Sequence, residues 1–372
     1  MNTVQKLAEL GQSIWYDNIE RGLLKNGEMA GMIKRGEIRG VTSNPTIFMK
    51  AITKTDDYDD ELGPLIEAGH SAEDIFWQLA IEDIQAATDL FRPLYDQTNG
   101  GDGYVSIEVK PSLAQDTQAT LAEAKSLWRR VNRPNLMVKI PATEAGIPAI
   151  AAATAAGINV NITLIFSRDR YAAVMDAYLQ GLEQRVAKGQ PIDGIASVAS
   201  FFVSRVDTLV DKRLQALIDK GGPQAEEATA LLGKAAIANA KLAYADYKRV
   251  FTSERFERLQ KKGARVQRPL WASTSTKNPA YNELVYVNEL IGPDTVNTIP
   301  PKTLVALLDH GVVKLTVEEN LDEAQTAIDR LEALGISMTD VTDELEHKGV
   351  KSFADAFTEL LAAVDERRQV AV

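Results

Sequence analysis

The sequence predicts an α/β fold of the (β/α)8 (TIM barrel) class, in which a parallel sheet closes on itself and helices cover its outer face. Eight short runs rich in β-branched and aromatic residues alternate with helical segments, which is the pattern of a parallel sheet. Eight such repeats favour the closed barrel over an open, doubly wound sheet. An open sheet usually carries a glycine-rich turn after its first strand, whereas this strand ends in Asp17-Asn-Ile-Glu-Arg21. We therefore expect one barrel domain over residues 1–372.

The predicted strands are short, mostly apolar and bounded by turn residues. Pro45 ends the second strand, because proline has no backbone N–H to donate to a sheet. In chain order the strands cover residues 13–19, 38–44, 104–110, 135–141, 158–166, 195–202, 268–274 and 295–300.

Helices are predicted between these strands, with additional helices at the N-terminus, between strands and at the C-terminus, about 317–372. Ser71-Ala-Glu-Asp74 has the pattern of a capping box, and Thr143 is expected to cap an alanine-rich helix. Gly221-Gly-Pro223 should break a long helical region that runs to about residue 262. The other helical segments are 3–12, those from the first strand to about residue 35, part of 46–70, 71–91, 114–131, 143–156, 167–188, one after Pro279, 301–310, 317–334 and 340–369.

The composition excludes several kinds of protein and site. The formal net charge of -11 argues against a broad surface for nucleic acid or anionic membranes. The chain has no cysteine and its three histidines lie far apart, so we expect no disulfide, no cysteine-ligated zinc, no thiol nucleophile, no histidine-based metal cluster and no Ser-His triad. No signal-peptide pattern and no run of 18 apolar residues is present. We expect a cytoplasmic protein; the net charge does not exclude a local site for a small anionic ligand, and the sequence leaves open whether the protein forms a homo-oligomer.

One predicted strand, Asn135-Leu-Met-Val-Lys-Ile-Pro141, carries a lysine among large apolar residues. A buried ammonium loses its hydration, so it is either paired or driven toward the neutral amine. A neutral amine on a rigid strand is a nucleophile toward carbonyl groups. The hypothesis is that Lys139 forms a Schiff base with a keto sugar. The alternative is a lysine that reaches solvent from the strand end.

Polar residues occur on one face of most predicted strands, toward the carboxyl end. Strands in a parallel barrel should be almost continuously apolar, and their side chains alternate between two faces. Burying Asp17, Glu108, Lys139, Asn161 and Thr163 together would be costly unless a site uses them. Barrels of this class place their chemistry at the carboxyl ends of the strands. Single members such as Ser106, Asn159 or Thr42 could instead be satisfied polar groups of the interior.

Six polar runs stand out in or directly after the predicted strands: Thr42-Ser-Asn-Pro-Thr46, Ser106-Ile-Glu-Val109, Val138-Lys-Ile-Pro141, Asn161-Ile-Thr-Leu164, Ser200-Phe-Phe-Val-Ser-Arg205 and Asn297-Thr-Ile-Pro300. These runs resemble the transaldolase family, and they occur in the family's order. With Asp17 in the first strand, the resemblance spans roughly residues 10–310. It implies a Schiff-base barrel without metal or organic cofactor, in the non-oxidative pentose phosphate pathway. The activity implied is transfer of a dihydroxyacetone unit from sedoheptulose 7-phosphate or fructose 6-phosphate to glyceraldehyde 3-phosphate or erythrose 4-phosphate.

The resemblance also implies a role for each matching residue. Lys139 matches the Schiff-base lysine and Asp17 the acid/base group for carbon–carbon cleavage. Glu108 matches the carboxylate that acts through a water, and Thr163 the threonine that orders this water. The substrate-binding positions implied are Thr42, Asn44, Asn161, Ser200, Phe202, Arg205 and Ser273, with Arg205 as the phosphate-binding arginine.

The chain departs from the better-known family members after the seventh strand. Where they carry an aromatic residue and a phosphate-binding arginine, this chain has Ala272-Ser-Thr-Ser-Thr-Lys277. Ser273 matches the family's serine, and Lys277 is the expected second cation. The additional length before this strand and at the C-terminus suggests a distinct, longer subclass.

The chemistry implied needs a dry pocket, because the retained enamine must be shielded from protonation. Phe202, Trp271 and Trp15 are expected to help exclude water, although they could simply fill the barrel. Two alternatives stay open. One is another class I lyase, such as a fructose-6-phosphate or deoxyribose-phosphate aldolase, and the other is a non-catalytic barrel that binds sugar phosphates.

Overall fold

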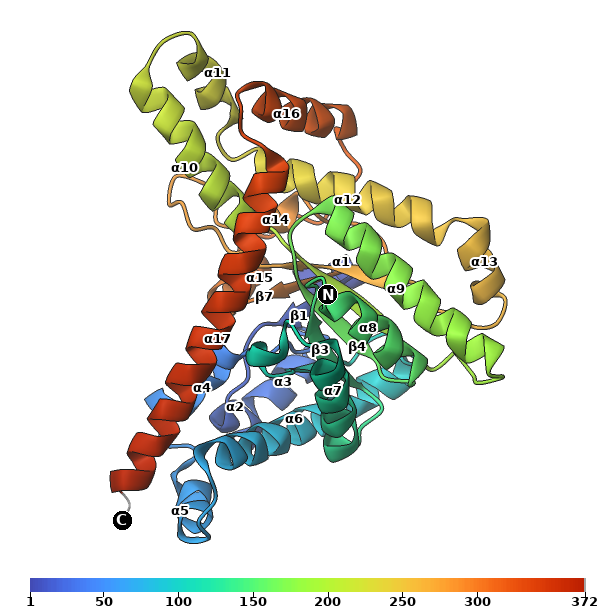
Figure 1. The fold of residues 1–372 in the computed structure, drawn as a ribbon, viewed down its shortest axis with the longest axis vertical. Coiled ribbons are helices and arrows are strands. Elements are labelled where there is room, and N and C mark those ends of the chain that lie inside the picture. Colours follow the sequence, from blue (N-terminus) through green and yellow to red (C-terminus); the bar gives the residue numbers. More distant parts are fainter. Residues whose placement is uncertain (371–372) are drawn as a thin grey trace.

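Seven parallel strands form one sheet that curls into a barrel surrounded by helices (Figure 1). The computed structural model describes residues 1–370. The strands lie in the order β1-β7-β6-β5-β4-β3-β2 along the sheet, so the predicted (β/α)8 barrel class is confirmed. Their bounds are β1 (Gln12–Tyr16), β2 (Val105–Glu108), β3 (Leu136–Pro141), β4 (Val160–Ile165), β5 (Ser197–Phe202), β6 (Gln267–Ala272) and β7 (Thr295–Ile299).

The segment around Val41 takes the eighth position of the ring, between β1 and β2. Val41 forms one parallel bridge with Tyr16 and another with Val105, so the sheet closes here. The predicted second strand is thus reduced to a single bridged residue. At Gly40 a Cβ atom would come within 2.7 Å of the Trp15 ring, so the backbone packs tightly against β1 at this point. The chain then turns at once into the next helix.

Helices precede, separate and follow the strands. The first part of the chain contains α1 (Thr3–Glu9), α2 (Arg21–Lys25), α3 (Glu28–Lys34), α4 (Pro45–Lys54), α5 (Asp59–Glu67), α6 (Ala72–Gln97), the 3-10 turn η1 (Pro111–Leu113), α7 (Thr117–Val131), α8 (Gly146–Ala155) and α9 (Arg168–Ala187). The second part contains α10 (Ser204–Lys220), α11 (Gln224–Leu231), α12 (Ala235–Phe251), α13 (Glu254–Gln260), α14 (Val285–Asn288), α15 (Pro301–His310), α16 (Leu321–Ala333) and α17 (Met338–Val370).

Most predicted helices are present, and the differences concern their ends and divisions. Ser71 caps α6 as predicted, because its Oγ accepts a hydrogen bond from the backbone of Asp74. The long region after β5 divides into α10 to α13, and Gly221 lies at its first break with φ +67°. The helix predicted after Pro279 is reduced to the single turn of α14. Thr143, expected to cap α8, is not its N-cap residue; that residue is Ala145, which makes no side-chain capping bond. Thr143 Oγ1 lies just before it and accepts a hydrogen bond from the backbone N–H of Gly146 at 3.0 Å.

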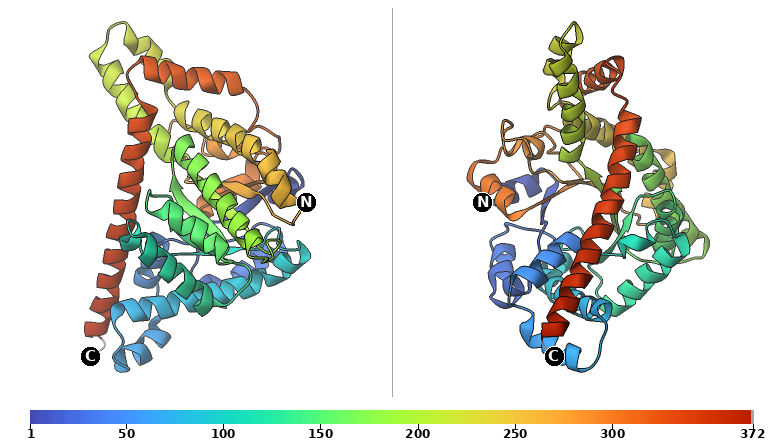
Figure 2. Two further views of the ribbon diagram at one scale, coloured as in Figure 1. Left: turned by 45° about the vertical axis from the view of Figure 1, so that its right-hand side comes forward. Right: turned by 60° about the vertical axis from the view of Figure 1, so that its left-hand side comes forward.

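Helix α17 is the longest element and crosses the end of the barrel at which the strands finish (Figures 1 and 2). It packs mainly against α4, and also against α6, α10, η1 and the end of β4. Within residues 1–370, no helix has the length and apolar character needed to span a bilayer. The extra C-terminal helix therefore lies over the same end of the barrel as the polar strand ends.

Candidate active site

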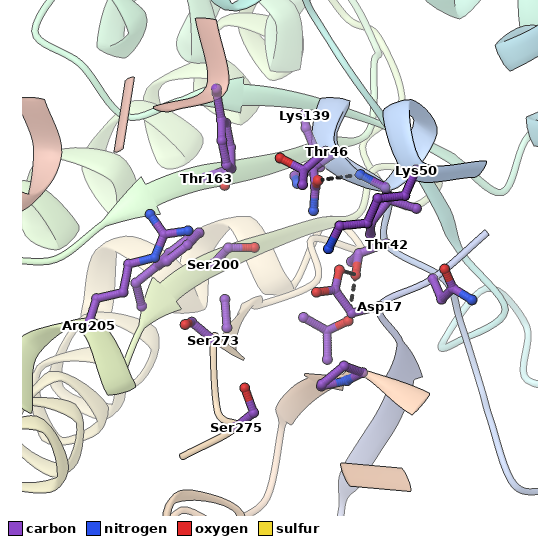
Figure 3. Close-up of a pocket in the computed structure, with 18 of the residues that line it drawn as sticks. Asp17, Thr42, Thr46, Lys50, Lys139, Thr163, Ser200, Arg205, Ser273 and Ser275 are labelled. Carbon is purple, nitrogen blue, oxygen red and sulfur yellow. Dashed lines mark hydrogen bonds between the residues drawn. The ribbon is translucent and has the colours of Figure 1, made fainter. Parts of the chain in front are cut away.

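A cavity of about 510 Å³ opens at the carboxyl end of the strands (Figure 3). Almost all of the predicted site residues line it, namely Asp17, Thr42, Asn44, Lys139, Thr163, Ser200, Phe202, Arg205, Ser273 and Lys277. Glu108 and Asn161 do not line the cavity, but each contacts a residue that does. The alternation of side chains along the strands therefore brings one set of polar groups to one place.

Lys139 and Glu108 form a buried ion pair at the base of this cavity. The two residues are direct neighbours in the register of β2 and β3. Lys139 Nζ lies 3.2 Å from Glu108 Oε2 and donates a hydrogen bond to Ser43 O at 3.0 Å. The side chains are only 6% and 5% exposed. Burial raises the pKa of Glu108, and nearby Asp17 adds to this, while Lys139 acts in the opposite direction.

Asp17 follows the last residue of β1 and faces the cavity. Its Oδ1 accepts a hydrogen bond from Thr42 Oγ1 at 2.7 Å, and Thr42 Oγ1 is 2.5 Å from Thr298 Oγ1. Burial raises the pKa of Asp17, against the opposing effects of the Thr42 hydrogen bond and the Lys139 and Arg205 charges. Asp17 and Glu108 are therefore two carboxylates with raised proton affinity, one directly after β1 and the other on β2.

Asn161, on β4, is held in place by hydroxyl groups from β2 and β5. Its Nδ2 donates to Ser106 Oγ at 3.0 Å, and its Oδ1 accepts from Ser200 Oγ at 2.7 Å. Thr163 lies two residues further along β4, and its buried Oγ1 has no hydrogen-bond partner among residues 1–370. A buried polar atom of this kind usually binds a water or a ligand.

The ends of β4 and β6 contain residues in the left-handed backbone region. Leu164 has φ +61° and Ser273 has φ +56°. The register between β4 and β5 shifts at this point, between Ile162 and Ile165. Non-glycine residues in this conformation are strained and often occur at functional sites. The Ser273 carbonyl also accepts a hydrogen bond from the backbone of Ser204 at 3.0 Å, which ties β6 to the start of α10.

Besides Lys139, three cations line the cavity, and none of these three has an ion pair among the described residues. Arg205, on α10, lies with its guanidinium 5.1 Å from the centre of the Phe202 ring. Lys277 donates a hydrogen bond to Ser275 Oγ at 3.0 Å. Burial lowers the pKa of Lys277, and the charges of Arg205 and Lys50 lower it further. Lys50 enters from α4, across the cavity from Arg205 (Figure 3).

Lys50 and Phe353 are pocket residues that the sequence reasoning missed. Lys50 could have been found, because Asn44 and Pro45 predict a helix start, and Thr46 and Lys50 then share one face of that helix. Asn44 does cap α4, accepting from the backbone of Ile47 at 3.0 Å. Phe353 lies far along α17, and no local pattern connects it with the strands.

The two tryptophans expected to line the pocket lie elsewhere in the barrel. Trp15 and Trp271 are fully buried, and neither lines the cavity. Trp15 Nε1 donates to Asp102 Oδ1 at 2.9 Å, in a cluster that also contains Ser13. Trp15 and Trp271 therefore fill the barrel interior, which was the alternative interpretation, whereas Phe202 does line the cavity.

Residues 1–370 contain no cluster of three or more histidine, aspartate or glutamate side chains able to hold a metal ion.

Comparison with known proteins gives one consistent family. The model of the Transaldolase/Fructose-6-phosphate aldolase family matches residues 14–364. A transaldolase of Thermobifida fusca (strain YX) is 50% identical over 365 residues, covering 98% of each chain. One from Parafrankia sp. (strain EAN1pec) is 49% identical over 362 residues, with 97% of this chain and 96% of the relative covered. One from Trichodesmium erythraeum (strain IMS101) is 45% identical over 372 residues, with coverage of 98% and 97%. The chain belongs to the Transaldolase/Fructose-6-phosphate aldolase family.

Proposed function

We propose that this cavity transfers a dihydroxyacetone unit between sugar phosphates through a Schiff base on Lys139. The donor would be sedoheptulose 7-phosphate or fructose 6-phosphate, and the acceptor glyceraldehyde 3-phosphate or erythrose 4-phosphate. One observation carries the proposal: a buried lysine at the base of a polar cavity, paired with a carboxylate at 3.2 Å. The relatives named transaldolase, similar over nearly the whole chain, support the same transferase activity.

Schiff-base formation requires an uncharged amine and the removal of one water from the carbinolamine. Glu108 is suited to take the proton from Lys139, because burial raises its pKa and so its affinity for protons. The same carboxyl can then return a proton to the leaving hydroxyl of the carbinolamine. Thr163 Oγ1, which has no partner among the described residues, can order a water between these groups.

Cleavage of the C3–C4 bond requires a base at the C4 hydroxyl of the bound ketose. Asp17 fits this role because it faces the cavity from a different strand than Glu108, so the two proton transfers use separate groups. The electrons of the broken bond pass into the iminium and give an enamine on Lys139. When the acceptor aldehyde binds, the enamine attacks its carbonyl carbon and Asp17 returns the proton.

Hydrogen-bonding side chains would hold the three-carbon unit in place. Asn161 is fixed by Ser106 and Ser200, so its orientation is set before the substrate binds. Asn44 and Thr42 line the cavity from the segment that follows Val41 and would bind further hydroxyls. Arg205, with Lys277, would bind the phosphate, because both cations are without ion pairs in the described structure.

Reduction with borohydride in the presence of fructose 6-phosphate tests the proposal. We expect a stable adduct that peptide mass mapping assigns to Lys139, and no adduct in the Lys139→Ala variant. Circular dichroism should show that this variant is folded. An adduct on Lys110, which pairs with Glu73 and Glu123 outside the cavity, would refute the assignment. The absence of any adduct would refute the Schiff-base mechanism.

Assays with fructose 6-phosphate also distinguish transfer to an acceptor from simple cleavage. Transfer requires erythrose 4-phosphate or another acceptor, whereas an aldolase would cleave fructose 6-phosphate without one. We expect turnover that depends on the acceptor.

We also propose a cytoplasmic location, because phosphorylated sugars do not cross bilayers unaided and the enzyme must share their compartment. Cell fractionation would test this location.

A further inference from the structure

The inner face of helix α17 closes the cavity beside Lys139. We propose that Phe353, on this helix, is a specificity-determining residue that keeps water from the retained enamine. By doing so it makes the protein pass the three-carbon unit to an acceptor and not release it. This inference rests on the Schiff-base function proposed above, and it assigns a role to a residue outside the barrel strands.

Phe353 is the part of α17 that reaches the reacting lysine. The centre of its ring lies 6.0 Å from Lys139 Nζ, and the residue is only 6% exposed. It lines the main cavity, most of whose other walls are polar. An aromatic ring at this position occupies space beside the amine that water would otherwise fill.

The two sides of Glu108 are also covered by α17. Phe353 and Val350 border one small cavity beside Glu108, and Phe357 borders a second one on the side of Ser43. Each has a volume of about 10 Å³. This is at the lower limit of ~10–15 Å³ needed for one water molecule. The helix therefore leaves the carboxylate with room for at most single waters on these sides.

Close packing fixes the position of α17 over the site. A Cβ atom at Gly349 would lie 2.9 Å from Leu164 Cδ2, so the helix backbone touches the end of β4. One turn beyond Phe353, the Phe357 ring packs edge-on against Phe76, with ring centres 5.5 Å apart. These contacts hold Phe353 in place without any help from the substrate.

Ion pairs attach both ends of the helix to the barrel. Arg213 Nη2 lies 2.6 Å from Glu344 Oε2, and Arg170 Nε lies 3.1 Å from Glu346 Oε2. Near the other end, Arg367 Nη1 lies 2.6 Å from Asp59 Oδ1. The helix is therefore attached on both sides of the cavity, and its middle, which carries Phe353, spans the opening.

The chemistry shows what this ring would prevent. After cleavage, the enamine on Lys139 has one productive partner, the aldehyde carbon of an acceptor. If water protonates the enamine carbon instead, an iminium of dihydroxyacetone forms. A second water then adds to its C2, the C2–N bond breaks, and free dihydroxyacetone leaves while the lysine amine is regenerated. Excluding water slows both steps of this loss and leaves attack on the acceptor unaffected.

The test is the ratio of two rates in one preparation of the full chain. The first is the release of free dihydroxyacetone from fructose 6-phosphate without acceptor, and the second is transfer to erythrose 4-phosphate. We expect Phe353→Ala to raise the release-to-transfer ratio at least tenfold and Phe353→Leu to keep it near the wild-type value. A role in folding alone would change both rates together and leave the ratio unchanged, which would overturn the proposal.

A matched control separates Phe353 from the general packing of α17. Leu360 is a fully buried residue on the same helix, about two turns beyond Phe353, that lines neither the main cavity nor the small cavities beside Glu108. Leu360→Ala should leave the ratio within about twofold of wild type. If both alanine variants raise it equally, the assignment to Phe353 is wrong. If Phe353→Ala does not fold, Phe353→Val serves in its place, and an unchanged ratio there refutes the proposal. A missing borohydride adduct in the wild type would instead refute the Schiff-base function.

Discussion

At the level of single residues, the site combines a buried ion pair with a border of unpaired cations. Lys139 and Glu108 are 3.2 Å apart and almost inaccessible, whereas Lys50 and Lys277 are exposed at the entrance. In a protein with a net charge of -11, cations without acidic partners are available to an anionic ligand. The phosphate of the substrate is the group that would use them.

Lys50 gives a prediction at this level. We expect Lys50→Met to raise KM for phosphorylated acceptors about three- to tenfold with little change in kcat, because one charge-assisted contact is lost at an exposed position. The KM for non-phosphorylated glyceraldehyde should not change. Steady-state kinetics with both acceptors measures this difference.

The control for this variant is Lys34→Met, which removes the same charge from the exposed surface of α3. It should leave both KM values unchanged. If Lys34→Met raises KM as much as Lys50→Met, the effect comes from net charge and not from the position of Lys50. An unchanged KM in Lys50→Met would show that Arg205 and Lys277 suffice for the phosphate.

The strand residues of the site could be predicted from the sequence, because side chains along a strand alternate between its two faces, and this alternation fixes which residues share a face. Lys139, Glu108 and Asn161 lie on β3, β2 and β4, and once the barrel closes their side chains must meet. Lys50 and Phe353 lie on helices, where the direction of a side chain depends on how the helix docks. No local pattern in α17 predicts that its middle lies across the barrel mouth.

At the level of elements, the docking of α17 depends on one glycine. Alanine is favoured over glycine inside helices by about 1 kcal/mol, so Gly349→Ala should stabilise the isolated helix. In the folded protein, the added Cβ would lie 2.9 Å from Leu164 Cδ2. Leu164 is buried and holds a left-handed backbone, so it has little room to move. We expect the clash to dominate and lower the free energy of unfolding by about 1–3 kcal/mol, as urea denaturation would measure.

Gly63 provides the opposite case within the same protein. It lies inside α5, and no atom lies within 4 Å of its hypothetical Cβ. Gly63→Ala should therefore stabilise the protein by up to about 1 kcal/mol. If both variants were stabilised, the contact between α17 and β4 would be looser than the structure indicates.

Some boundaries of helices and strands are set by local sequence signals, and others are set by tertiary contacts. Ser71 signals the start of α6 locally, and the structure agrees. The second predicted strand is reduced to the bridge at Val41, where the Gly40 backbone packs tightly against Trp15, and that contact depends on the closed barrel. Sequence periodicity could predict the class of the fold but could not predict where tertiary contacts shorten a strand.

For the whole molecule, buried carboxyl groups outside the site set how stability depends on pH. Asp207, on α10, accepts hydrogen bonds from the Ala236 backbone on α12 and from Tyr286 Oη on α14, so it joins three helices. Burial raises the pKa of Asp207 to about 6 from 3.8. Between these values the folded protein binds more protons than the unfolded chain, so the free energy of unfolding falls as pH rises through this window.

The variant Asp207→Asn tests this relation, because asparagine keeps an acceptor for the Ala236 N–H and does not titrate. Over about two pH units, the wild type should lose about 3 kcal/mol through Asp207 that the variant does not lose. Urea denaturation at pH 4 and pH 7 would measure both proteins. Asp89→Asn is the control, since its pairing with Arg133 lowers the pKa of Asp89 and moves its titration below this window. If wild type and Asp207→Asn showed the same pH dependence, Asp207 would be ionised in the folded protein throughout this range, and its hydrogen bonds would compensate fully for its burial.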